Sequence, residues 1–314
     1  MRAYVLLVLL LAAAIVGAAV LADHARRSGA ASAAVPPNAT HAVAVAAPLM
    51  LVTPRSRREV CLGGFSHPKK LLPGPAPERA FCISLSYREK KWTRVRRELA
   101  SHGIESERLT AVVGKQLWPD DYDERAVSER FRKHVQKKPQ HMGHLGCSLS
   151  HTNLYRTVVD DRVEGPVLVV EDDATFGPRF GAQLRDRVAR VTAVDPEWDV
   201  LLLGFSCGYH SYDKCHENDG AEILGGGCLM RVRRFIGAWG YVLNGRAAAA
   251  RVLAGLFPHG WAIDHHMCDM AAAGKLRLYG CVPTIAFHPG EFAISSAGYV
   301  KVEPYANYVS DTNA

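Results

Sequence analysis

Three acidic residues stand next to one another directly after an apolar run. Glu171, Asp172 and Asp173 follow residues 165–170, which have the composition of a buried strand. Adjacent carboxylates repel one another unless a cation or several hydrogen-bond donors lie among them. The pattern predicts a divalent metal site with oxygen ligands, where the metal offsets negative charge on a departing group. Asp173 is the first candidate for direct metal ligation, with Glu171 beside it.

The orientation of the triplet follows from strand periodicity. Neighbouring strand residues point to opposite faces, so Glu171 and Asp173 are expected on one side and Asp172 on the other. A different role for the same acids is to cap the helix that follows or to pair with nearby arginines.

A second group of chemically capable residues lies at helical spacing upstream. His144, Cys147 and His151 are separated by three and then four residues, which places them along one face of a helix. Zinc can use these residue types. The alternative is a buried helix in which Cys147 packs and the polar side chains face a cleft.

Two cysteines flank a polar loop after the apolar segment 198–204. A disulfide between Cys207 and Cys215 would contribute about 2.5 kcal/mol in the chain-entropy model and would hold that loop in place. Free thiols are the alternative, because pairing among eight cysteines does not follow from sequence alone.

Apolar strand patterns alternate with helical patterns along the chain. This order predicts an α/β domain with a mainly parallel central sheet, in which ligands bind beyond the carboxyl ends of the strands. The acidic triplet stands at such an end. The expected strands cover residues 79–85, 165–170, 198–204, 239–243 and 277–281, and the expected helices cover residues 87–102, 180–194, 246–256 and 263–273.

Several segments, taken in order, carry a family resemblance. They are residues 143–151, 169–174, 198–204, 237–243 and 263–265. Together they resemble glycosyltransferase family 25, over residues 81–296. The resemblance implies a GT-A-like fold, an inverting mechanism, a UDP-hexose donor with galactose the commonest sugar, and Mn²⁺ as cofactor. It also implies donor contacts, at Ser84, Arg88, Lys91, His151, Glu171 and Asp172.

An inverting transfer needs one base to accept the proton of the acceptor hydroxyl. Asp264 occupies the family's aspartate position at the start of a predicted helix, and Glu291 is a second candidate base. An N-cap for that helix is the alternative role of Asp264. His288 is a candidate additional metal ligand. The expected acceptor is a hydroxyl of a glycan, glycolipid or protein; the competing hypothesis is an inactive lumenal binding or adhesion protein.

The N-terminal part differs from the rest in composition. Residues 3–22 are apolar and without charge, which suits a transmembrane helix, or alternatively a cleaved signal peptide. Residues 23–79 are rich in Ala, Pro, Gly, Arg and Ser and are expected to form a disordered stem before a catalytic domain of residues 80–314.

The sequence also indicates a cellular compartment. Eight cysteines and the sequon Asn38-Ala39-Thr40 suit an oxidising lumen. We therefore expect a single-pass protein of the Golgi or endoplasmic reticulum membrane with a lumenal catalytic domain, or a secreted protein if the N-terminus is cleaved. The net charge of +7 comes without a nucleic-acid recognition motif, so nucleic acid is not an expected partner.

Overall fold

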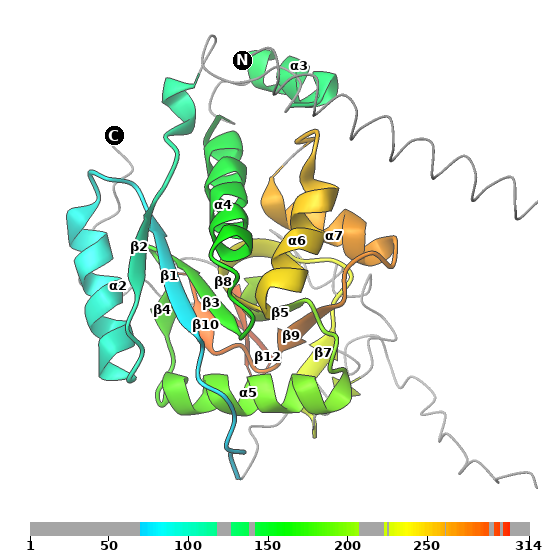
Figure 1. Ribbon diagram of the computed structural model, residues 1–314. Helices are drawn as coiled ribbons and strands as arrows, with labels where there is room; N and C mark the ends of the chain where they lie inside the picture. Colours follow the sequence, from blue (N-terminus) through cyan, green and yellow to red (C-terminus); the bar gives the residue numbers. More distant parts are fainter. Residues whose placement is uncertain are drawn as a thin grey trace, which may run out of the picture. The chain divides into compact units, whose positions relative to one another are not determined.

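The structure is a computed structural model of the chain (Figure 1). It describes residues 70–117, 127–137, 142–206, 223–224, 226–260, 262–288, 292–295 and 298–301. The chain divides into two compact units, Met1–Val52 and Thr53–Ala314, and all described residues belong to the second. Within the described ranges, no helix combines the length and apolar character needed to cross a bilayer. The apolar segment 3–22 lies outside them.

A mixed eight-stranded sheet forms the centre of the described unit, with strand order β2-β1-β3-β8-β5-β9-β7-β6. Its pairings give six strands one direction, while β7 and β8 run the opposite way. The prediction of a mainly parallel sheet is confirmed in this sense. The strands are β1 (Arg79–Ser84), β2 (Glu107–Thr110), β3 (Val167–Glu171), β5 (Val200–Ser206), β6 (Ile223–Leu224), β7 (Leu229–Arg231), β8 (Ile236–Leu243) and β9 (Leu278–Cys281).

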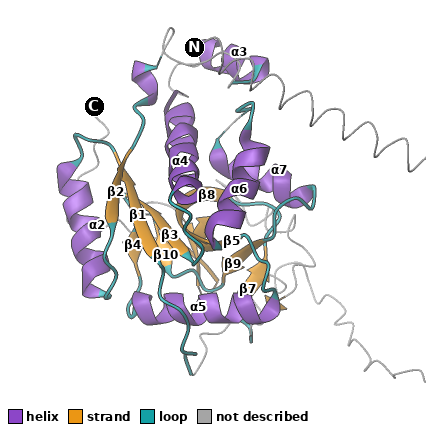
Figure 2. Ribbon diagram, viewed as in Figure 1, coloured by secondary structure: helices purple, strands orange, loops and turns teal. Residues whose placement is uncertain are grey.

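Helices cover the sheet on two faces (Figures 1 and 2). Alternate residues of β3 explain this: Val167 and Val169 pack with α4, α6 and α7, whereas Leu168 and Val170 pack with α2 and α5. A strand buried on both faces needs a continuous apolar run, as the sequence has here. The helices are α2 (Glu89–Ser101), α3 (Glu129–Lys137), α4 (Met142–Asp160), α5 (Phe180–Val194), α6 (Gly245–Leu256) and α7 (Ile263–Ala272), with the 3-10 turn η1 (Gly114–Gln116).

Two short ribbons complete the described fold. β4 (Thr175–Phe176) pairs with β10 (Ala286–Phe287), and β11 (Phe292–Ser295) pairs with β12 (Gly298–Lys301). The first ribbon matters for the site, because it brings the chain after β10 close to the chain after β3.

The amino-terminal half of α4 packs in backbone contact with the loop after β2. A Cβ atom on Gly146 would come within 2.6 Å of the Gly114 nitrogen and 2.7 Å of the Val112 oxygen. Glycine at 146 is therefore required for the helix to approach so closely. This approach sets the position of the polar side chains that α4 presents to the end of β3.

The residues just before β1 lie against α5. The Leu72 amide donates to Asp186 Oδ1 at 2.7 Å, and the Glu78 amide donates to the Pro166 carbonyl at 2.7 Å. Residues 70–78 of the expected stem thus contact the domain before the first strand begins. The chain enters the sheet at the amino end of β1, whereas the triplet lies at the carboxyl end of the parallel strand β3.

Candidate functional site

The acidic triplet lies where two parallel strands end. Ile83 of β1 pairs with Glu171 of β3, and the Asp172 amide donates to the Ile83 carbonyl at 3.1 Å. The strand ends at Glu171, so Asp172 and Asp173 form the turn that follows. Since α5 begins at Phe180 without a side-chain cap, the triplet does not cap that helix.

Asp172 is held by residues at the end of β1 and before α2. Ser84 Oγ donates to Asp172 Oδ2 at 2.9 Å, and Arg88 Nη1 lies 3.3 Å from Asp172 Oδ1. Burial and the neighbouring charge of Asp173 raise the pKa of Asp172, against the opposing effects of Ser84, Arg88 and Lys91. Four of the expected donor-binding residues therefore lie together here: Ser84, Arg88, Lys91 and Asp172.

Asp173 turns towards the end of β10. Its Oδ2 lies 3.5 Å from His288 Nε2, while its buried Oδ1 has no hydrogen-bond donor among the described residues. Burial alone would raise the pKa of Asp173, but the hydrogen bond and charge of His288, with the charges of Lys91 and Arg88, lower it. A buried carboxylate oxygen without a donor, next to an imidazole, suits a cation ligand.

Glu171 points to α4 and contacts two of its residues. His151 Nε2 lies 3.2 Å from Glu171 Oε1, and the Cys147 thiol donates to the same oxygen at 3.6 Å. The other ring nitrogen of His151 lies 2.7 Å from the Tyr241 hydroxyl, which in turn lies 2.9 Å from the Tyr155 hydroxyl. The ligand atoms of Cys147, His151 and Glu171 all lie within 4.8 Å of one another.

The three acids thus point to three different elements. The alternation of side chains holds only as far as Glu171, where β3 ends, and Asp173 lies in the turn beyond it, beside His288. The expected zinc group also changes: among the described residues Glu171, not His144, joins Cys147 and His151.

Asp264 is the second residue of α7 and is 8% exposed. Its Oδ2 accepts from the Gly237 amide at 2.9 Å, and its Oδ1 accepts from the His265 amide at 2.8 Å. The N-cap position belongs to Ala262, so the N-cap role is wrong for Asp264. Together with burial, the charges of Glu171 and Asp264 raise the pKa of the Cys147 thiol, which indicates that Asp264 faces the same region.

Arg108 of β2 is a site residue that the sequence did not reveal. Its Nη2 donates to the carbonyls of Leu85 at 2.7 Å and Ser86 at 3.1 Å, and its Nη1 donates to Glu89 at 2.5 Å. The loop between β1 and α2, which carries Arg88, is therefore braced from the neighbouring strand. Only the strand register brings Arg108 here, opposite Cys82.

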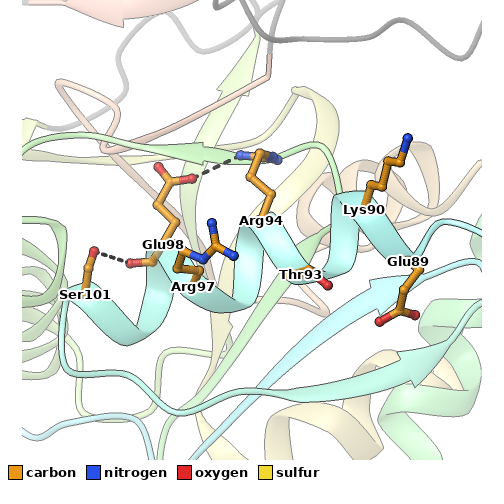
Figure 3. A pocket seen from close by; sticks show the side chains of 7 residues that line it. All are labelled: Glu89, Lys90, Thr93, Arg94, Arg97, Glu98 and Ser101. Carbon is orange, nitrogen blue, oxygen red and sulfur yellow. Dashed lines mark hydrogen bonds and ion pairs between the residues drawn. The ribbon is translucent and has the colours of Figure 1, made fainter.

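A surface pocket of about 590 Å³ lies along α2 (Figure 3). All of its lining residues come from that one helix, so it lacks the convergent groups of a catalytic cleft. Arg94, in this pocket, contacts Glu98 at 3.0 Å and donates to the backbone carbonyls of Asp172 and Ala174. Through these two hydrogen bonds, Arg94 of α2 helps to hold the turn after β3 in place.

Some expected residues lie outside the described ranges. Glu291, the second candidate base, and the expected disulfide partners Cys207 and Cys215 are among them. Within the described part, Cys82, Cys147, Cys268 and Cys281 carry free thiols.

Comparison with known proteins gives a consistent result. Residues 78–267 match the model of "Glycosyltransferase family 25 (LPS biosynthesis protein)". The chain is similar to procollagen galactosyltransferase 1 of Danio rerio, 29% identical over 129 residues, 40% of this chain and 21% of the fish protein. It is also similar to a glycosyltransferase 25 family member of Drosophila melanogaster, 31% identical over 131 residues, 40% of this chain and 21% of the insect protein. The match spans about one fifth of the length of these relatives.

Proposed function

Because the chain belongs to glycosyltransferase family 25, we propose that it transfers a hexose, galactose in the first instance, from a UDP-sugar to a hydroxyl acceptor. The acceptor class is a glycan, glycolipid or protein, and the transfer inverts the anomeric configuration. Family membership supports the transferase activity, and the name of the similar procollagen galactosyltransferase supports galactose.

The observation that carries the proposal is the environment of Asp173. A buried carboxylate oxygen without a donor in the described residues, and a second oxygen 3.5 Å from His288, form a place for a divalent cation at the end of β3. Oxygen and imidazole ligands are compatible with Mn²⁺. When bound, such a cation offsets the negative charge of the departing diphosphate. Asp173 and His288 are the residues that would hold it, with Glu171 as the third candidate.

Positive charge for the donor comes from the region between β1 and α2. Ser84 is 1% exposed and Asp172 is 3% exposed, so both act mainly by holding Arg88 in place. Arg88 and Lys91 are partly exposed and bring cationic groups beside the triplet. Electrostatic attraction to a diphosphate follows from this arrangement. His151 positions Glu171 from the other side.

Asp264 is the proposed general base. The amides of Gly237 and His265 fix the plane of its carboxylate, and each oxygen keeps a further acceptor position for a hydroxyl proton. In the proposed step Asp264 takes the proton of the acceptor hydroxyl as that oxygen bonds to the anomeric carbon, and UDP departs with the electrons of the broken bond. Glu291 remains the second candidate.

The apolar residues 3–22 and the sequon at Asn38 support a proposal for location. We propose a single-pass protein of the Golgi or endoplasmic reticulum membrane whose catalytic domain faces the lumen. A protease-protection assay on microsomes from expressing cells, with glycosidase treatment, tests this orientation. Cleavage of the catalytic domain in sealed microsomes would contradict it.

A donor screen tests the proposed reaction. Full-length protein in detergent is incubated with Mn²⁺ and each member of a UDP-sugar panel, and UDP release is measured without acceptor. We expect release to be fastest from UDP-galactose and to require the divalent cation. Absence of both turnover and Mn²⁺-dependent UDP binding in folded protein would overturn the proposal.

A further inference from the structure

The geometry points to a second cation site, formed by Cys147, His151 and Glu171, that selects a thiophilic divalent cation such as Zn²⁺ and is separate from the Asp173–His288 position. It goes beyond the proposed transfer reaction, because its ligands include a thiol and it does not depend on a donor sugar. The three residues come from α4 and the end of β3.

Two of the three separations between the ligand atoms are close to those of tetrahedral coordination. Zinc bonds of about 2.3 Å to sulfur and about 2.0–2.1 Å to nitrogen and oxygen imply separations of about 3.6 Å between sulfur and oxygen and about 3.4 Å between nitrogen and oxygen. The structure has 3.6 Å between Cys147 Sγ and Glu171 Oε1, and 3.2 Å between His151 Nε2 and the same oxygen. The third separation, between Cys147 Sγ and His151 Nε2, is within 4.8 Å, so a small movement of the side chains admits the ion.

A hydrogen bond on the far ring nitrogen holds His151 in place, as is usual for histidines that bind metals. One ring nitrogen of His151 contacts the Tyr241 hydroxyl at 2.7 Å, which leaves the other nitrogen directed at Glu171. Such a partner on the far nitrogen fixes the ring orientation and is typical of metal ligands. His151 is fully buried, whereas the Glu171 side chain is 27% exposed, so solvent reaches one side of the group. Water then supplies the fourth ligand, as in three-ligand zinc sites.

Ligand chemistry separates this site from the one at Asp173. Thiolate and imidazole favour Zn²⁺ over Mn²⁺, whereas carboxylate and water favour the harder ion. Binding at the second site displaces the Cys147 thiol proton to solvent. Glu171 and Asp173, which are separated by Asp172, would then hold different cations. On the premise of the proposed function, Zn²⁺ at the second site withdraws Glu171 from the triplet and inhibits transfer.

Cobalt titration tests the site without any activity measurement. Co²⁺ added to the full-length protein in detergent is expected to give the near-ultraviolet charge-transfer band of a cobalt–thiolate bond, saturating at one equivalent and lost on addition of Zn²⁺. Cys147→Ser should remove the band. Asp173→Asn should keep it, because that change affects only the other cation position.

Two outcomes would overturn the inference: no thiolate band in folded wild-type protein, or an undiminished band in Cys147→Ser. Circular-dichroism melting of each variant shows whether it is folded. Glu171→Gln is the second test, since it keeps the side-chain volume and should weaken cobalt binding at least tenfold. Failure of the transferase proposal would leave these spectra unchanged, so the two hypotheses are tested separately.

Discussion

His288 Nε2 lies 3.5 Å from Asp173 Oδ2, which joins the chain after β10 to the turn after β3. The ribbon between β4 and β10 makes this contact possible, because Phe287 pairs with Thr175. The imidazole, with the nearby cationic groups, lowers the pKa of Asp173 despite its burial. Asp173 is therefore charged at neutral pH, as a cation ligand must be.

Replacing Asp173 by Asn should abolish transfer and leave the protein folded, because the amide keeps the shape of the carboxylate without its charge. Transfer is measured with Mn²⁺ and UDP-galactose, and folding by circular dichroism. Asp160→Asn, at the exposed end of α4, is the matched control and should retain activity. Wild-type activity in Asp173→Asn would count decisively against the cation site.

The variant Asp264→Asn should bind UDP with unchanged affinity but transfer sugar about 10²-fold more slowly or worse, the scale expected for a lost general base. Isothermal titration calorimetry measures the affinity for UDP, and initial rates measure the transfer of sugar. Asp269 lies exposed on the same helix, so Asp269→Asn is the control. If Asp264→Asn transfers at the normal rate, Glu291 becomes the residue to test.

Removal of the Arg108 guanidinium should weaken donor binding more than catalysis. Arg108→Gln loses the bonds to the carbonyls of Leu85 and Ser86, so the loop that carries Arg88 is no longer braced. A charged hydrogen bond of about 1.5 kcal/mol corresponds to a rise on the order of tenfold in KM for the UDP-sugar. Arg96→Gln, on the exposed face of α2, should leave KM unchanged. A fall in kcat alone would contradict the positioning role.

His259 should make the protein less stable in mild acid. It is fully buried, and burial, together with the charges of His266 and Arg156, lowers its pKa to about 4. The unfolded chain takes up a proton on this residue below its ordinary pKa of about 6.5, while the folded protein does not, so stability falls as pH falls from about 6.5 towards about 4. At pH 5 the expected loss is about 2 kcal/mol relative to pH 7.5.

Urea unfolding of wild type and His259→Gln at these two pH values measures that loss. The variant should lose most of this part of the pH dependence, although it is less stable overall. His102→Gln, at a partly exposed position, should keep it. An equal pH dependence in wild type and His259→Gln would show that other groups are responsible.

Local sequence pattern predicted the parts of the site that depend on one element. The strand before the triplet, the helix that begins near Asp264 and the helix after Arg88 all follow from apolar periodicity, and the structure confirms them. The contacts of Arg108 and Tyr241 depend instead on which strands pair and in what register. An isolated sequence carries little information about such pairing, because many registers bury the same apolar residues.

The orientation of the acids illustrates the same limit. Alternation along β3 ends at Glu171, and the turn that holds Asp172 and Asp173 obeys no such period; Asp173 lies there beside His288. The helical spacing of Cys147 and His151 was visible in the sequence, whereas their acidic partner from β3 was not.

The three contiguous acids connect three separate elements of the fold. A peptide of three residues cannot stretch, and it is attached through Glu171 to α4, through Asp172 to the start of α2, and through Asp173 to the chain after β10. Each of these three elements therefore has a direct side-chain contact with the same turn. Segments that are distant along the polypeptide thus meet at one short turn.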